Sequence, residues 1–160
     1  MLILNSGGTF NKRYNKLNGE LEVPFDNNAV NEILETYSLE YSLAGAVYKD
    51  SLDMEFNDRK MLADIIRESD KTSFIVIHGT DTMHLSAEFF DELFDDITIV
   101  FVGSMKPFEI DKIEATLNLG IALGFLQSNR KNGVFISMNG YVKEYNQIEK
   151  NRLKGKFEVV

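Results

Sequence analysis

The chain has 160 residues, of which 44% are hydrophobic and 26% charged, and its formal net charge is −8 at pH 7. This length and balance are typical of one globular domain that can bury a core. The acidic excess offers no basic surface for nucleic acid or an anionic membrane, so we expect neither as a partner. The lack of cysteine excludes disulfides and thiolate metal sites.

The N-terminus shows no targeting signal. Met1 leads directly into a short apolar strand, without the basic region and long apolar stretch of a signal peptide. No apolar run approaches the roughly 20 residues that a membrane-spanning helix needs. We therefore expect a cytoplasmic protein.

The first expected strand, Leu2 to Leu4, runs into a turn that contains two glycines and ends at Thr9. Glycine lets the backbone turn tightly and approach a ligand, although such a turn alone is more often structural than functional. Residues 11–25 are polar and show no helical period. They predict a surface loop with a β-hairpin around Asn18-Gly19.

Two helices and a strand are expected next. Asp26 or Asn27 opens a helix that runs to about Tyr37, and a strand follows from Tyr41 to Tyr48. This strand ends at Asp50-Ser51-Leu52-Asp53-Met54, where a serine between two carboxylates is most often a turn and a cap. Asn57 or Asp58 is expected to cap the next helix, which runs to about Ser69.

The central stretch is an apolar strand, Phe74 to Ile77, followed at once by the turn His78-Gly79 and the polar residues Thr80-Asp81-Thr82. One of these three is expected to cap a helix that runs to Phe94. Open α/β sheets bind ligands at such turns, outside the carboxyl ends of their strands. We therefore expect chemistry here, and the alternative is that Thr80 and Asp81 only cap the helix.

The remaining elements are a strand from Ile97 to Val102, a helix from Lys112 to Gln127 and a last core strand from Val134 to Met138. The chain is then polar until Phe157, and no element is assigned there. Five continuously apolar strands that alternate with four helices predict an α/β fold. We expect a single three-layer domain, residues 1–160, with a mostly parallel, flavodoxin- or Rossmann-like sheet.

Several motifs resemble those of the bacterial L-asparaginase family. His78 to Met83 is similar to the family signature HGTDTM at all six positions, and Ser6-Gly7-Gly8-Thr9 resembles the signature TGGT. Residues 50–54 resemble GSQDM at Ser51, Asp53 and Met54, but Leu52 replaces the glutamine that helps to hold an α-ammonium group. Residues 103–107 resemble GAMRP, and Asn118-Leu119 matches the end of DGPFNL.

The resemblance implies an L-asparaginase-type amidohydrolase that needs no cofactor or metal. Thr9 would be the nucleophile that forms an acyl-enzyme and releases ammonia from the side chain of L-asparagine. Thr80, Asp81 and Lys150 would handle the protons, and Tyr14 would close over the nucleophile from a mobile lid. Lys150 is chosen because the family's essential lysine lies twelve residues after the methionine of a Met-Asn pair, here Met138.

The same resemblance implies how an amino-acid substrate is held. Ser51 would bind its α-carboxylate and Asp81 its α-ammonium group, while Gly8 and Asp50 are further candidates for substrate contact. Backbone N–H groups at the Thr9 and Thr80 turns would stabilise the oxyanion.

Only the N-terminal domain of the family is resembled. Its usual C-terminal domain, which supplies an acidic residue to the ammonium pocket of a neighbouring subunit, is expected to be absent, as in short single-domain asparaginase-like proteins. We therefore expect a homodimer or a higher homo-oligomer. A non-catalytic amino-acid-binding or regulatory domain is the alternative, favoured by Leu52 and the lost acidic residue. A flavodoxin-like nucleotide binder is a weaker one, because the chain has neither GxGxxG nor a P-loop.

Overall fold

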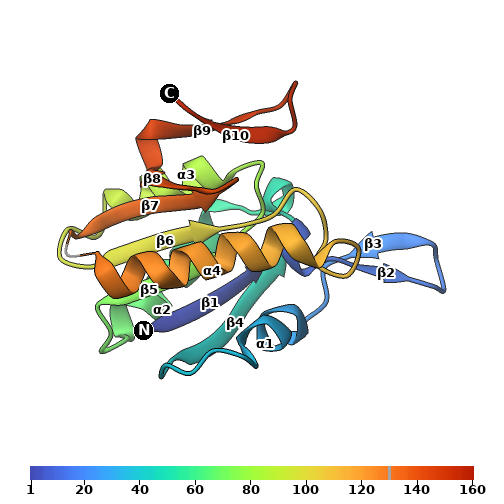
Figure 1. Ribbon diagram of the computed structural model, residues 1–160, viewed down its shortest axis with the longest axis horizontal. Coiled ribbons are helices and arrows are strands. Elements are labelled where there is room, and N and C mark those ends of the chain that lie inside the picture. Colours follow the sequence, from blue (N-terminus) through green and yellow to red (C-terminus); the bar gives the residue numbers. More distant parts are fainter. Residues whose placement is uncertain (130) are drawn as a thin grey trace.

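A six-stranded sheet in the order β4-β1-β5-β6-β7-β8 runs through the middle of the molecule (Figure 1). It is seen in a computed structural model that describes residues 1–129 and 131–160. Five of its strands are parallel neighbours: β4 (Ser42–Lys49), β1 (Leu2–Gly7), β5 (Ser73–Ile77), β6 (Thr98–Val102) and β7 (Gly133–Met138). The sixth, β8 (Tyr141–Glu144), pairs antiparallel with β7 at one edge.

Helices cover both faces of this sheet, as predicted. The helices α1 (Asn28–Leu34) and α4 (Lys112–Ser128) lie on one face, and α2 (Phe56–Glu68) and α3 (Met83–Asp91) lie on the other (Figure 1). Alternate residues of each strand enter the two cores, so that Leu4 packs on the α2 and α3 side while Ile3 packs on the α1 and α4 side. The three-layer α/β architecture is therefore confirmed. No helix in the described part of the chain is both long and apolar enough to span a membrane.

Three predicted helix limits are wrong, and one of them is the end of α3, which lies at Asp91 and not at Phe94. The helix α1 ends at Leu34 rather than near Tyr37, because the Tyr37 N–H turns back to the carbonyl of Leu34 in a three-residue step. The helix α2 starts at Phe56, so its N-cap is Glu55 and not Asn57 or Asp58. Asp58 lies inside the first turn, where its Oδ2 accepts the Glu55 N–H at 2.8 Å.

The predicted hairpin is present as β2 (Arg13–Asn15) and β3 (Glu20–Glu22), which pair antiparallel. Gly19 in its turn has a φ of 79°, a conformation that suits glycine. Figure 1 shows this hairpin extending away from the sheet. The segment 11–25 is thus an arm on the body of the molecule rather than an irregular loop.

The main omission of the sequence prediction is the structure after Asn139. A turn at Asn139 and Gly140, both with positive φ, leads into β8. A short 3-10 turn, η3 (Tyr145–Gln147), then leads to a hairpin of β9 (Ile148–Asn151) and β10 (Lys156–Val159). The side chains of Ile148 and Phe157 anchor the hairpin in the core beside α2 and α3. This hairpin carries Lys150 to the site described below.

Candidate functional site

Turns that follow three neighbouring strands meet at the carboxyl edge of the sheet. The turn after β1 contains Gly8, and the turn after β5 contains Gly79. The two backbones touch so closely that a Cβ on Gly8 would lie 2.3 Å from the nitrogen of Gly79. Gly79 packs in turn on Ser51, which follows β4. Thr9 and Thr80 directly follow these two glycines in the sequence, so the contact brings together the two turns that carry them.

Replacing Gly8 with Ala should therefore damage the protein strongly. Gly8 has a φ of 75°, and the added methyl group would collide with backbone atoms that cannot move aside. We expect a loss of about 3 kcal/mol or more in the free energy of unfolding, measured by urea denaturation. The control is Gly120→Ala on α4, where no atom lies within 4 Å of the new Cβ. That change should stabilise the helix by up to about 1 kcal/mol, and equal effects of the two changes would contradict the close contact.

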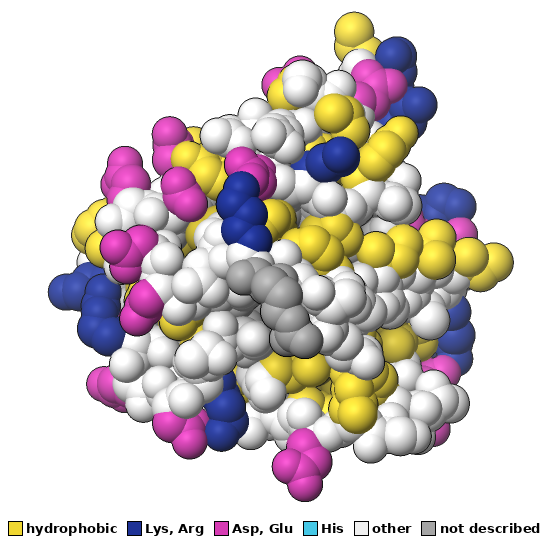
Figure 2. Space-filling model, turned by 60° about the vertical axis from the view of Figure 1, so that its left-hand side comes forward, with side chains coloured by type: hydrophobic (Ala, Val, Ile, Leu, Met, Phe, Trp, Pro, Cys, Tyr) yellow, Lys and Arg dark blue, Asp and Glu magenta, His cyan; other side chains and the backbone are white. Residues whose placement is uncertain are grey.

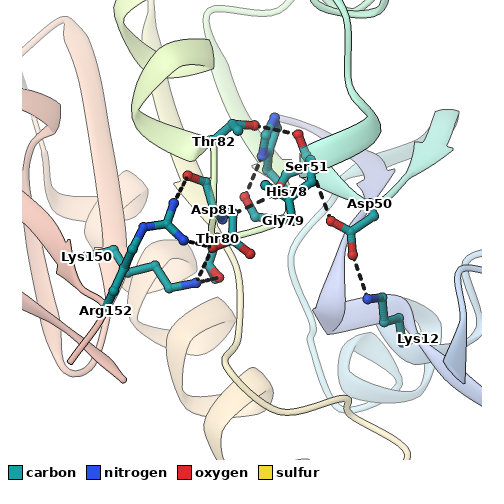
Figure 3. A network of polar contacts seen from close by, with 11 residues as sticks. Lys12, Asp50, Ser51, His78, Gly79, Thr80, Asp81, Thr82, Lys150 and Arg152 are labelled. Atoms are coloured by element: carbon teal, nitrogen blue, oxygen red, sulfur yellow. Dashed lines mark hydrogen bonds and ion pairs between the residues drawn. The ribbon is translucent and has the colours of Figure 1, made fainter. Parts of the chain in front are cut away.

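A cationic side chain joins the turn after β5 from the far end of the chain (Figure 3). The Nζ of Lys150, on β9, lies 2.8 Å from the Oγ1 of Thr80 and 2.9 Å from the Oδ1 of Asp81. Its side chain is only 14% exposed. A hydroxyl, an amine and a carboxylate in direct contact form a path along which protons can move.

A second cation holds the same carboxylate. One guanidinium nitrogen of Arg152 donates to the Oδ1 of Asp81 at 2.6 Å, and the other donates to the backbone carbonyl of Asp81 at 3.2 Å. Burial alone would raise the pKa of Asp81, but the hydrogen bonds and charges of Lys150 and Arg152 outweigh it and hold that pKa below its usual value. Asp81 is therefore an ionised acceptor at neutral pH.

The turn after β4 is hydrogen-bonded to the turn that carries Asp81 and Thr82. Ser51 is 1% exposed, and its Oγ accepts the backbone N–H of Asp81 at 3.2 Å. The hydroxyl of Thr82 donates to the carbonyl of Ser51 at 2.7 Å, so Thr82 stands at the N-cap position of α3 without capping it through its side chain. Thr82 is thus the N-cap residue of α3, one of the three residues expected there, but its side chain makes no capping hydrogen bond. The side chains of these three residues bond to other elements instead.

Asp50 is also paired with a cation. Its Oδ2 lies 2.5 Å from the Nζ of Lys12, and its Oδ1 accepts the N–H of Leu52 at 3.0 Å (Figure 3). Burial acts to raise the pKa of Asp50, yet the bonds from Lys12 and Leu52 bring it below the ordinary value. Both carboxylates at the strand ends, Asp50 and Asp81, are thus ionised and bound to basic side chains.

His78 fixes the turn from inside the core. Its Nδ1 lies 2.7 Å from the carbonyl of Gly79, so Nδ1 carries the proton, and its Nε2 lies 2.8 Å from the hydroxyl of Ser86. His78 therefore bonds within its own strand-end turn. Arg59 extends this network, because it donates to Ser86 at 2.9 Å and to Thr82 at 3.2 Å.

Complete burial lowers the pKa of His78 to about 4, so His78 is neutral in the folded protein. In the unfolded chain a histidine has a pKa near 6.5, and the unfolded state therefore binds the extra proton between about pH 6.5 and 4. The free energy of unfolding should be at its full value above pH 6.5 and should fall by about 3 kcal/mol towards pH 4 on account of this group alone. His78→Gln should lose that part of the pH dependence in urea titrations, while His84→Gln, at the exposed second histidine, should keep it. Identical pH profiles of the two variants would contradict the assignment.

Among the described residues, the other two residues named for catalysis, Thr9 and Tyr14, take no part in the hydrogen bonds that join Lys150, Thr80 and Asp81. Thr9 opens a short 3-10 turn, η1 (Thr9–Asn11), and its carbonyl accepts the N–H of Lys12 at 3.1 Å. Tyr14 lies on the β2–β3 hairpin with 53% of its surface exposed, and its backbone N–H donates to Glu109. Among the described residues, the hydrogen bonds that join Thr80, Asp81 and Lys150 do not include Tyr14.

Sequence reasoning missed Lys12, Arg59 and Arg152. Each lies far along the chain from its partner, as in the pair of Arg152 with Asp81, 71 residues apart. Charged residues in polar segments carry no local pattern that predicts such partners. Only the hairpin β9–β10, once seen, shows why Arg152 reaches the same carboxylate as Lys150.

A cavity of about 300 Å³ adjoins this group on the side of α3 and the C-terminal hairpin. Its lining comprises Thr80, Asp81, His84, Glu88, Tyr145, Asn146, Ile148, Glu149, Lys150, Arg152, Phe157 and Val160. The lining does not include Gly8, Thr9, Asp50 or Ser51. Within residues 1–129 and 131–160, no group of three or more histidine and acidic side chains is placed to hold a metal ion.

Comparisons with known proteins agree on one family. A family model described as "Asparaginase, N-terminal" matches residues 1–155. A glutaminase-asparaginase of Acinetobacter glutaminasificans is 32% identical over 83 residues, which are 50% of this chain and 25% of that protein.

Solved structures share the fold. The thermostable L-asparaginase from Thermococcus kodakarensis matches with a TM-score of 0.86 at 17% identity, covering 99% of this chain and 50% of that one. A probable cytoplasmic L-asparaginase from Campylobacter jejuni matches with a TM-score of 0.76 at 23% identity, covering 99% and 52%. The chain thus spans about half the length of these proteins.

Proposed function

Because the chain belongs to the asparaginase family through the N-terminal domain of that family, we propose that it is an amidohydrolase that converts L-asparagine to L-aspartate and ammonia. The observation that carries this proposal is the contact of the Lys150 amine with the Thr80 hydroxyl at 2.8 Å, beside Asp81. A buried lysine that bonds a hydroxyl and a carboxylate is the arrangement that a proton relay requires.

In the proposed reaction Thr9 is the nucleophile. Its hydroxyl oxygen attacks the amide carbon of the substrate, the C–N bond breaks, and ammonia leaves with the proton that the hydroxyl gave up. Water then attacks the resulting ester, which frees the acid and restores the hydroxyl. Thr80, Lys150 and Asp81 move the protons in both steps. The backbone N–H groups of Thr9 and Thr80 are the proposed donors to the oxyanion.

The proposed substrate contacts come from the three strand-end turns. Ser51 would bind the α-carboxylate, with Gly8 and Asp50 close by, and Asp81 would meet the α-ammonium group. The role of Ser51 is supported by its bond to the N–H of Asp81, which ties the two groups together. Tyr14 would join them only when the β2–β3 hairpin folds over Thr9, and such closure excludes water from the reaction.

A non-catalytic amino-acid-binding domain is the second candidate. It is favoured by Leu52, whose side chain is exposed and apolar beside Ser51 and cannot hold an ammonium group. The experiment that separates the two is a coupled assay of ammonia release with L-asparagine, L-glutamine and D-asparagine. We expect slow but measurable release from L-asparagine. Binding of L-asparagine without any release would instead favour the binding domain.

Self-association is part of the proposal. Electrostatic stabilisation is weak in a site that water can enter, and a second copy of the chain is an economical cover for the strand-end site. Apolar side chains stand exposed on α4, among them Ile113 and Leu117, and Figure 2 shows patches of hydrophobic side chains between charged ones on one face. Light scattering should therefore give at least twice the 18.2 kDa of one chain. A fully active monomer at assay concentration would contradict self-association.

We also propose that the protein is located in the cytoplasm.

A further inference from the structure

Both carboxylates at the strand-end site already have cationic partners within the chain. Asp50 is bound to Lys12, and Asp81 is bound to Lys150 and Arg152. Asp81 uses one oxygen, Oδ1, for both of its cations. Glu88 and Glu149 also line the cavity beside Asp81, so the selectivity argued here rests on the occupancy of Asp81 and not on a net charge. An incoming ammonium group must therefore compete with the chain's own cations.

Arg152 is the cation that an ammonium group would displace. Lys150 is 14% exposed and also bonds Thr80. Arg152 is 62% exposed and, among the residues that the structure describes, bonds only Asp81, through the carboxylate and the backbone carbonyl (Figure 3). An exposed ion pair is weaker than a buried one. The free-energy cost of separating Arg152 from Asp81 is therefore modest. A substrate without an ammonium group would not incur this cost.

We propose that Arg152 is a substrate-selecting residue: by occupying Asp81 it makes the site prefer monoamides of dicarboxylic acids that lack a free α-ammonium group, such as succinamate, over L-asparagine. This inference rests on the proposed amide hydrolysis and concerns the same site. The bonds made and broken are unchanged, since the amide C–N bond is exchanged for a C–O bond from water and ammonia leaves. Arg152 acts through Asp81 and does not touch the reacting atoms.

The first test measures binding of the products and needs no turnover. Succinate lacks the ammonium group that L-aspartate carries, and the affinities of both are measured by calorimetry. The unmodified protein should bind succinate at least as tightly as L-aspartate. Arg152→Gln should bind L-aspartate about fivefold more tightly and should not bind succinate more tightly. Lys154→Gln removes an equal charge from the same hairpin, where Lys154 bonds Glu158, and should change neither affinity.

The second test follows ammonia release from L-asparagine and succinamate. Arg152→Gln should lower KM for L-asparagine about fivefold while kcat stays the same, and KM for succinamate should not fall. Arg152→Lys, which keeps the charge, should remain close to the unmodified protein. A merely structural role of Arg152 would shift both substrates together.

Three results would overturn the inference: much tighter binding of L-aspartate than of succinate by the unmodified protein, equal shifts of both ligands in Arg152→Gln, or binding of neither. The proposed function fails separately. Binding that follows the expected pattern without ammonia release from any amide would reject hydrolysis and support selection by Arg152. Ammonia release with an unchanged ratio of KM values in Arg152→Gln would support hydrolysis and reject selection.

Discussion

Thr9→Ala is expected to abolish ammonia release while the protein stays folded. Thr9 supplies the attacking oxygen in the proposed reaction, and no neighbouring group can replace an oxygen that forms the covalent ester. Thr80→Val should have an effect of similar size, because it removes the hydroxyl that Lys150 contacts at 2.8 Å and keeps the shape of the side chain. Each loss should be on the order of a thousandfold or more in kcat, measured by the coupled ammonia assay.

The matched control is Thr116→Ala on α4, which removes an exposed threonine hydroxyl that takes no part in the hydrogen bonds of Thr80, Asp81 and Lys150 among the described residues. It should leave kcat unchanged, and the far-ultraviolet circular dichroism of all three variants should match that of the unmodified protein. Unmodified turnover by the Thr9 variant would exclude Thr9 as the nucleophile.

Lys150→Met is expected to reduce kcat about as far as Thr80→Val, since methionine keeps the length of the side chain and removes its amine. The double variant should be little worse than either single variant, because the members of one proton relay lose their effect together. A double-variant cycle on kcat measures this coupling directly.

Lys156→Met serves as the control, because Lys156 lies on β10 of the same hairpin, with its side chain exposed and, within residues 1–129 and 131–160, paired only with Glu158. It should not affect kcat. Independent and additive losses from Lys150→Met and Thr80→Val would mean that the two groups act separately.

The strands of the core could be predicted from the sequence because burial on two faces leaves a strong pattern. Phe74 to Ile77 is apolar without interruption, and the structure buries all four residues between the two helical layers. The C-terminal hairpin could not be predicted in the same way. Strand β9 has one fully buried apolar residue, Ile148, among charged ones, so its apolar pattern is too weak to distinguish a strand from a polar loop.

The site was only partly predictable for a related reason. The turns after β1, β4 and β5 meet because parallel strands end at one edge, which is a rule of the fold that local sequence can use. The choice of Lys150 came from the resemblance to the asparaginase family, through its spacing after Met138, and in the structure its amine lies beside Thr80 and Asp81. The pair of Arg152 with Asp81 depends on the path of a hairpin that had not been predicted. Tertiary packing, and not local sequence, determines which residues form ion pairs of this kind.

The central claim, an acyl-enzyme on the chain, is tested most directly by partition of the intermediate between water and hydroxylamine. Two substrates with the same acyl group and different leaving groups, L-asparagine and the β-methyl ester of L-aspartate, are compared at one hydroxylamine concentration. A common acyl-enzyme predicts the same ratio of hydroxamate to aspartate from both substrates. A ratio that depends on the leaving group, or hydrolysis without any hydroxamate, would contradict the account.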